Sequence, residues 1–438
     1  MNKLIHSTDA PTRRQFLSGA AKTFLGVGLM QQMQGVPVFG APGLGTSPLK
    51  QVATARNVIY LYMTGGMSHL DTFDPRPENK EVNGETEVIK TNADGIRISN
   101  SLPLMARQMD KVALIHSLNS TQGAHEQGQY YMHTSYTLRS SIRHPAMGAW
   151  LQKFQERGNP SLPGSVMIGN DSRHPGAGFF EAKFSPLMVN DPDDGVANSK
   201  LNKWFAESED RFSSRLAITR KLDAGFAEQY NVKNVRAYAD MYDDAVRMMK
   251  SEELKAFDLS AEEDTLRAKY GRESSFGQGC LLARRLVEHG VRHVEVSFGN
   301  WDTHNANFIR VPELCDELDA ALSTLLQDLE SRGLLQETLV VLATEFGRTP
   351  EINQNDGRDH HPKAFTCLMA GGGIRGGQAF GKKDEKGFEV VENKVGIPDF
   401  NATVAYALGI PLDQVLYSPS KRPFTVADKG RPITQIFG

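Results

Sequence analysis

Residues 57–63 read NVIYLYM and run directly into Thr64-Gly65-Gly66. A continuous apolar run of this length, closed by glycines, is typical of a strand that is buried on both faces. Similar runs occupy residues 112–116, 165–168, 291–298, 338–344 and 365–370. Helical patterns separate them, and the clearest, about Pro312 to Arg332, repeats leucine every three or four residues. This alternation predicts an α/β fold with a doubly wound, mostly parallel sheet flanked by helices.

The region of about residues 198–270 breaks this alternation. It is long and charged, and it contains no strand-like run. We therefore expect a helical insertion on one side of the sheet, with its charges on a solvated face. Residues 41–438 are otherwise expected to form a single α/β domain.

The beginning of the chain has the features of an export signal. Arg13 and Arg14 lie within Thr12–Leu17, a mild apolar stretch follows at residues 19–33, and small residues lie near 38–41. This order predicts a twin-arginine signal peptide of about residues 1–40. The stretch is too short and too rich in glycine to span a membrane. We expect the twin-arginine export machinery as a partner and a periplasmic or extracellular location, with no membrane span in the mature chain.

Composition narrows the classes of function. The chain has 49 basic and 52 acidic residues, for a net charge of −3, and no basic stripe that would favour nucleic acid. The three cysteines lie far apart and form no Cys-x-x-Cys pair. Neither a disulfide framework nor a zinc–thiolate site is therefore indicated.

Three polar segments follow strand-like runs in the second half of the chain: Trp301–His304, Glu345–Arg348 and Arg358–His361. In an open α/β sheet, the loops that leave the carboxyl ends of the strands build the binding site. Carboxylates and imidazoles brought together there are metal ligands. We expect Asp302, His304 and His360 to hold a divalent ion, with Glu345 adjacent. Zinc is the first expectation, and manganese or calcium follow because of the carboxylates.

The same segments carry a family resemblance, together with Gly65–Pro75, His125–Thr134, Thr349-Pro350 and Ala370–Gly373. From about Asn57 to its end, the chain resembles the exported bacterial proteins called domain of unknown function 1501. That family belongs to the alkaline phosphatase and sulfatase superfamily. The resemblance implies an alkaline-phosphatase-like fold and a metal-dependent site.

The resemblance also implies roles for single residues. Asp71 is the carboxylate nearest to the acidic metal ligand that follows the superfamily's first strand, and His125 stands where the superfamily places its nucleophile. Asp302 and His304 look like a ligand pair for one metal, and His360 is similar to the final histidine. Glu345-Phe346 replaces an Asp-His pair, so a carboxylate is kept and an imidazole is lost. A phosphohistidine, a metal-activated water or a degenerate site that only binds are all compatible with these departures.

The remaining candidates are expected to contact substrate. Arg348 and Arg358 are candidates for holding phosphate or sulfate oxygens, and structural salt bridges are an equal expectation for both. Ser68, His69 and His361 are expected to line the substrate site. Two functions stay open: a metal-dependent hydrolase of a phosphate or sulfate ester, on a small molecule or a glycan, and a non-catalytic envelope protein that binds an anionic glycan or a partner.

Overall fold

A computed structural model describes residues 53–196, 214–215, 217–219, 221 and 243–438. The expected signal peptide lies outside the described residues, as does most of the expected insertion at 198–270. From residue 243 onward that region is described, and it contains short helical segments and no strand up to residue 270.

A nine-stranded sheet forms the centre of the described chain, in the order β12-β4-β11-β8-β1-β7-β5-β6, with β15 beside β4. Every strand pair is parallel except those of β11, which runs antiparallel to both β4 and β8. The fold class expected from the sequence is confirmed. The strands are β1 (Asn57–Met63), β4 (Val112–Asn119), β5 (Ser165–Ile168), β6 (Leu187–Val189), β7 (His293–Phe298), β8 (Thr338–Thr344), β11 (Phe365–Ala370), β12 (Gln378–Phe380) and β15 (Val395–Gly396).

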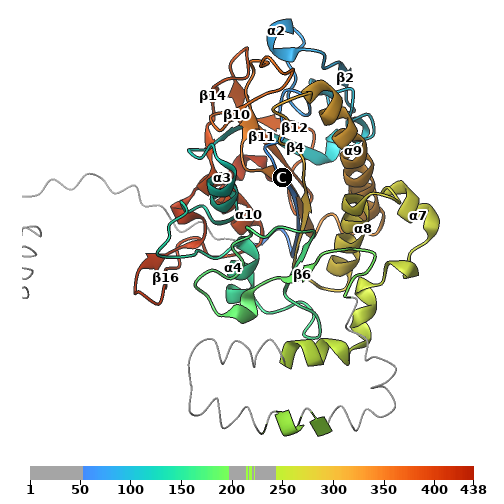
Figure 1. Cartoon of the computed structure of the whole chain (residues 1–438), viewed down its shortest axis with the longest axis vertical. Helices are drawn as coiled ribbons and strands as arrows, with labels where there is room; N and C mark the ends of the chain where they lie inside the picture. Colours follow the sequence, from blue (N-terminus) through green and yellow to red (C-terminus); the bar gives the residue numbers. More distant parts are fainter. Residues whose placement is uncertain (1–52, 197–213, 216, 220, 222–242) are drawn as a thin grey trace, which may run out of the picture. The chain divides into compact units, whose positions relative to one another are not determined.

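Strand β1 shows why the sheet is covered on both faces. Successive side chains of a strand point to opposite faces, and all seven residues of β1 are buried. Ile59, Leu61 and Met63 join the core that includes α8 (Ser275–Glu288) and α9 (Asn307–Ser331). Tyr60 and Tyr62 join the opposite core with α4 (Met147–Phe154) and α10 (Ile397–Ala407). Figure 1 shows these helices on the two sides of the sheet, with α3 (His125–Thr134) on the side of α4 and α10.

Smaller elements complete the described chain. None of the described helices has the length and hydrophobicity needed to cross a membrane. The helices are α2 (Lys80–Asn83) and α7 (Asp264–Lys269), with 3-10 segments η1 (Met105–Arg107), η2 (Met109–Lys111), η3 (Ala182–Phe184), η4 (Glu252–Phe257), η5 (Leu259–Ala261), η6 (Val426–Lys429) and η7 (Thr434–Ile436). The short strands are β2 (Val88–Lys90), β3 (Arg97–Ser99), β9 (Gly347–Arg348), β10 (His360–His361), β13 (Lys382–Lys383), β14 (Val390–Glu392), β16 (Leu416–Tyr417) and β17 (Pro423–Phe424).

One edge of the sheet gathers the polar loops. Strands β1, β4, β7 and β8 run parallel, so the segments that follow them leave from the same edge. Because β11 is antiparallel, the loop that precedes it arrives at that edge as well. Four segments distant in sequence therefore meet at one place: those that follow β1, β4 and β7, and the connection from β8 to β11.

Candidate metal centre

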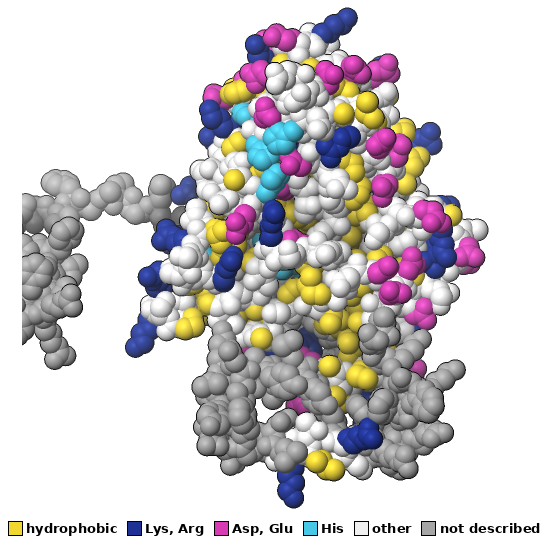
Figure 2. Space-filling view, viewed as in Figure 1, with side chains coloured by type: hydrophobic (Ala, Val, Ile, Leu, Met, Phe, Trp, Pro, Cys, Tyr) yellow, Lys and Arg dark blue, Asp and Glu magenta, His cyan; other side chains and the backbone are white. Residues whose placement is uncertain are grey.

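Three histidines and one aspartate converge at this edge. Asp302 and His304 follow β7, His125 is the first residue of α3, and His360 begins β10. The Nε2 atom of His125 lies 3.2 Å from Asp302 Oδ2, and those of His304 and His360 lie 3.1 and 3.3 Å from Asp302 Oδ1. We call these four residues the edge group. Histidine side chains gather on part of the molecular face in Figure 2, which agrees with the partial exposure of this group.

The second ring nitrogen of each histidine is held by an acceptor. Nδ1 of His125 lies 2.9 Å from Glu345 Oε1, and Nδ1 of His304 lies 2.7 Å from Asp359 Oδ1. Nδ1 of His360 lies 2.9 Å from the carbonyl oxygen of Gly123. Carboxylates and carbonyls only accept, so all three Nδ1 atoms carry the proton. This is the arrangement found around metal-binding histidines, because it leaves the Nε2 lone pair free for the ion.

The Nε2 atoms of the three histidines are arranged to bind a cation rather than to hydrogen-bond with one another. Nε2 of His304 lies only 3.0 Å from Nε2 of His360, and one proton at most can be shared between them. Nε2 of His125 is buried and has no well-formed hydrogen bond. Ligands on a tetrahedral zinc ion with bonds of about 2.0–2.1 Å lie roughly 3.3 Å apart, close to the separations seen here.

The four residues are not equivalent. Ligand atoms of His125, Asp302 and His360 all lie within 4.8 Å of one another, whereas His304 approaches two of the three. The side chain of His304 is also more exposed than those of His125 and His360. His125, Asp302 and His360 thus form the inner set, and His304 lies at its solvent side.

Glu345 supports the inner set through a hydrogen bond from His125. Its Oε1 atom takes the His125 Nδ1–H and the backbone N–H of Gly65, at 2.9 and 2.8 Å, and the Tyr62 hydroxyl lies 3.2 Å from Oε2. Gly65 has φ +117°, and a Cβ there would lie 2.5 Å from the backbone nitrogen of Asp302. Only glycine lets the β1 loop approach the β7 loop so closely. Glu345 therefore orients His125 through its Nδ1–H.

Arg348 fixes Asp302 from the protein side. Its side chain is fully buried, and Nη2 contacts Asp302 Oδ1 while Nε donates to the carbonyl of Gly66 at 2.8 Å. Burial would raise the pKa of Asp302, but the hydrogen bond and charge of Arg348 outweigh it and lower this pKa to about 2. Asp302 is thus an anion at neutral pH. Arg348 acts by positioning Asp302. Its guanidinium group makes four contacts within the chain, one to Asp302 and three to backbone carbonyl oxygens.

Phe346 closes the group on one side. Its ring centroid lies 5.2 Å from that of His125 and 4.6 Å from that of His360. An apolar ring thus packs against two imidazoles at the position where the resemblance would place another ligand. The edge group offers donors for one ion rather than two.

Asp71 and Arg358 lie outside the edge group and are bound to each other. Arg358 donates from Nε and Nη2 to the two carboxylate oxygens of Asp71, at 2.7 and 3.0 Å, and both residues are buried. Ser68, Thr86 and Asn307 donate to the same carboxylate. All five N–H groups of Arg358 have acceptors in the chain. This network uses the groups that the expected metal role of Asp71 and the expected substrate roles of Ser68 and Arg358 would require, and it favours structural roles for all three.

His69 and His361 are likewise buried beneath the surface. Nε2 of His69 contacts the Gly387 carbonyl at 3.2 Å, and Nε2 of His361 contacts the Phe388 carbonyl at 2.7 Å. Burial lowers the pKa of both imidazoles, so they are neutral. Both rings contact the backbone of the 384–388 loop, which favours a supporting role over the expected contact with substrate.

A second group of imidazoles and a carboxylate lies within the fold, and it was not identified from the sequence. It consists of His133, His174 and Glu295, and we call it the buried group. Nε2 of His133 lies 2.9 Å from Glu295 Oε1, and Nε2 of His174 lies 3.4 Å from Oε2. Glu295 interrupts the apolar run of β7, and a charge in a doubly buried strand was the available signal.

The hydrogen bonds and the pKa of His133 together make the buried group an ion pair. Nδ1 of His133 donates to the Gln129 carbonyl at 2.8 Å, and Nδ1 of His174 accepts the N–H of Gly176 at 3.1 Å. Nε2 of His174 therefore carries the proton of that ring, and Nε2 of His133 faces the carboxylate of Glu295. Burial would lower the pKa of His133, but the charge and hydrogen bond of Glu295 raise it to about 9. No imidazole lone pair is left for a metal.

A helix end lies beside the edge group. Helix α3 begins at His125, and its preceding residue, Ala124, provides no side-chain cap. The first N–H groups of a helix lack internal partners and carry partial positive charge, so they favour an anion. Such N–H groups form a site that favours anions.

The fold and the edge group together define an α/β protein with a candidate one-ion centre at the carboxyl ends of its parallel strands. The chain belongs to the family described as Protein of unknown function (DUF1501), whose model matches residues 55–437. The family expected from the motifs is thereby confirmed. No curated protein sequence matches the chain.

Several solved structures are similar to this one. The PsFucS1 sulfatase from Pseudoalteromonas sp. shares 12% identity at a TM-score of 0.43, over 86% of this chain and 73% of that one. The alkaline phosphatase from the Antarctic bacterium TAB5 shares 10% identity at a TM-score of 0.33, over 76% of this chain and 96% of that one. The chemistry of the edge group is inferred from this chain's own contacts.

Proposed function

We propose that this protein is a metal-dependent hydrolase of a phosphate or sulfate ester. The observation that carries the proposal is the convergence of three Nε2 atoms on the Asp302 carboxylate, with every Nδ1 held by an acceptor. Imidazoles and one carboxylate favour zinc over the oxygen-preferring calcium, and manganese is the second choice. The ion would act as a Lewis acid on the ester oxygen.

The chain's own residues divide the remaining work. Arg348 holds Asp302 in its ionised form, and Glu345 sets the ring of His125. The uncapped N-terminus of α3 offers N–H groups to the anionic oxygens. His125 faces the inner set with Nε2, so we assign it as a ligand in preference to a nucleophile. Arg348 is a positioning residue in this scheme.

Metal analysis and an ester assay on the full chain test the proposal together. We expect about one zinc per chain after purification without chelator, and hydrolysis of 4-nitrophenyl phosphate or 4-nitrophenyl sulfate that a chelator abolishes. The His360→Ala variant should lose both, whereas His174→Ala should keep both. Protein that binds no divalent ion under these conditions would contradict the proposal.

The second candidate function is binding without catalysis. Phe346 occupies the place of a further ligand, and the group therefore lacks donors for the two-ion arrangement of ordinary phosphatases. Protein that binds one zinc ion and anionic esters, yet releases no 4-nitrophenol from either substrate, would support this alternative.

Export is a separate part of the proposal. The paired Arg13 and Arg14 support transfer by the twin-arginine route to the periplasm or the exterior. Replacing both with lysine should leave a precursor in the cytoplasm. Normal maturation of that variant in cell fractions would refute this route.

A further inference from the structure

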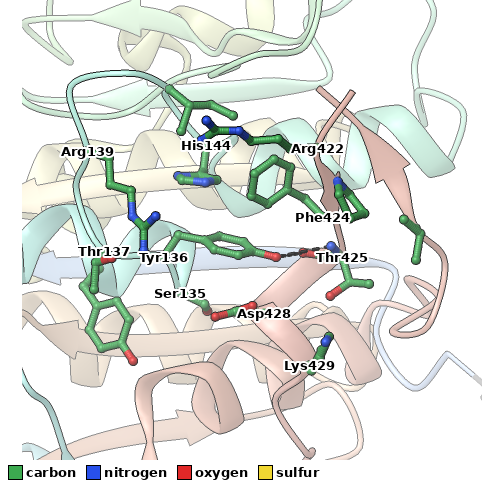
Figure 3. A pocket seen from close by; sticks show the side chains of 14 residues that line it. Ser135, Tyr136, Thr137, Arg139, His144, Arg422, Phe424, Thr425, Asp428 and Lys429 are labelled. Carbon is green, nitrogen blue, oxygen red and sulfur yellow. Dashed lines mark hydrogen bonds between the residues drawn. The ribbon is translucent and has the colours of Figure 1, made fainter. Parts of the chain in front are cut away.

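A cavity of about 660 Å³ lies beyond the far end of α3, between residues 135–144 and the segment 415–429. Its wall contains an aromatic group, in which Tyr136 stacks on His144 with ring centroids 4.3 Å apart and planes at 12°. Phe424 packs edge-on against both rings, at 5.3 and 4.8 Å. Figure 3 shows these three side chains together at the cavity. Its volume lies within the range of small-molecule sites, about 300–1,000 Å³.

The cavity has an excess of positive charge. Arg139, Arg422 and Lys429 line it, and Asp428 is the acidic side chain among its lining residues. Within the described part of the chain, none of the three cations has an ion-pair partner at salt-bridge distance. Burial lowers the pKa of His144 to about 4, so this imidazole adds no charge at neutral pH. Two positive charges are therefore left for an anionic ligand.

Two further features of the wall indicate a ligand. Thr425 has only 7% of its surface exposed, and its buried Oγ1 atom has no hydrogen-bond partner. Ala427, Asp428 and Lys429 have φ values of 57°, 42° and 64°, in the left-handed region that such residues rarely adopt. Backbone held in this way gathers at binding sites. The Tyr136 hydroxyl donates to the Thr425 carbonyl at 2.7 Å and ties the two sides of the cavity together.

We propose that this cavity binds a saccharide that carries sulfate or phosphate groups. Aromatic rings offer apolar surface to the C–H face of a sugar ring, and the unpaired hydroxyl of Thr425 can bond to a sugar hydroxyl. The guanidinium groups of Arg139 and Arg422 match the paired oxygens of a sulfate or phosphate. Apolar rings, a free hydroxyl and surplus cations fit one ligand of this chemistry.

Helix α3 connects the cavity to the edge group. It carries His125 at its first residue and Tyr131, a cavity residue, in its second half. Its ten residues span about 15 Å at 1.5 Å per residue. An extended oligosaccharide can bridge such a distance. The binding site stands by itself, but its role in presenting a charged glycan to the edge group rests on the proposed function.

Isothermal titration calorimetry on the full chain tests the site with sulfated maltotetraose and with unmodified maltotetraose. We expect the sulfated sugar to bind more tightly, and to bind less tightly as salt increases. Arg139→Gln/Arg422→Gln should weaken binding about tenfold or more, and Phe424→Leu should weaken it by a smaller factor. Arg107→Gln/Arg272→Gln removes the same charge from exposed positions elsewhere and should bind as the unmodified chain does.

The same titrations in the His304→Ala/His360→Ala background separate the two proposals. Binding that persists there, with metal lost, assigns the sugar to the cavity whatever the edge group does. An equal loss of affinity in Arg139→Gln/Arg422→Gln and in Arg107→Gln/Arg272→Gln would overturn the proposal. The absence of binding at millimolar sulfated maltotetraose would overturn it as well. Oligoglutamate that binds as tightly, with no effect of Phe424→Leu, would identify an acidic peptide as the ligand and overturn the saccharide assignment.

Discussion

Helix α3 contributes one histidine to each of two groups that have similar composition and different chemistry. His125 belongs to the edge group, and His133, eight residues later, belongs to the buried group. Both groups join imidazoles to a carboxylate from β7 or the loop after it. The two groups differ in the hydrogen-bond partners of their Nδ1 atoms. Acceptors at all three Nδ1 atoms leave lone pairs in the edge group, whereas the N–H of Gly176 on Nδ1 of His174 removes one in the buried group.

This difference teaches that residue type alone does not define a metal site. The buried group has its charge balanced by His133 and Glu295, and it needs no ion. The edge group places three nitrogens around one carboxylate, and the contact between His304 and His360 is unfavourable without a cation or a shared proton. The hydrogen bonds behind the ligands decide the chemistry.

The sharpest way to break the comparison is to remove the shared carboxylate of the edge group. Asp302→Asn should reduce zinc content from about one per chain to near zero and lower ester hydrolysis on the order of a thousandfold. The reason is that the three imidazoles lose their anionic partner. Elemental analysis and the 4-nitrophenyl ester assays measure both effects. Retention of zinc by this variant would show that the edge group is not the site.

The corresponding change in the buried group should affect stability instead. Glu295→Gln leaves an imidazolium without its counter-ion in the core and should cost about 3–5 kcal/mol in the free energy of unfolding. Urea denaturation measures this cost, and zinc content should not change. Glu181→Gln, in an exposed pair with Lys153, is the control and should cost under about 1 kcal/mol. Similar losses for the two variants would argue against a buried ion pair.

Stability should also depend on pH through His133. Its pKa rises from 6.5 to about 9 on folding, so the pair stabilises the protein fully below pH 6.5 and loses that contribution as the pH rises toward 9. The shift corresponds to at most about 3 kcal/mol. Urea denaturation from pH 6.5 to 8 should show the fall in the unmodified chain and a flatter profile in His133→Gln. Parallel profiles would contradict the assignment of the charge to His133.

The smallest effect is expected for Asp359, which accepts the hydrogen bond of His304. Asp359→Asn weakens the acceptor that fixes Nδ1 of His304 and should lower zinc affinity about tenfold. Asp356→Asn alters an exposed carboxylate in the same loop and is the matched control. Competition with a chromogenic chelator measures both affinities. Unchanged affinity in Asp359→Asn would place His304 outside the metal centre.

The sheet, and the meeting of Asp302 and His360 at its edge, could be predicted because local patterns specify them, whereas His125 was expected at the nucleophile position and not among the ligands. The run 57–63 coincides with β1, since a doubly buried strand has to be apolar throughout. Asp302 and His360 were identified because they follow or precede such runs. Nε2 of His360 lies 3.3 Å from Asp302 Oδ1.

The partners of the ligands could not be predicted in the same way. Asp71 and Arg358 are 287 positions apart, and only the folded chain shows that each occupies the other's hydrogen-bonding groups. The roles of Asp359 and Gly123 behind His304 and His360 depend on ring orientation, for which the sequence has no local signal. Sequence patterns identify residue types at strand ends, and three-dimensional packing selects among them.

The strand partners of β4 have a consequence for the order in which the sheet is assembled. Strand β4 is bonded in the sheet to β11, β12 and β15, all of which come from the last part of the chain. Until β11 is made, β4 has no place in the sheet, and His125 is not held opposite Asp302. His360 itself arrives just before β11. In the proposed metal site, the residues that would hold the ion can therefore come together only after β11 has been made, whereas Asp302 and His125 are made long before it.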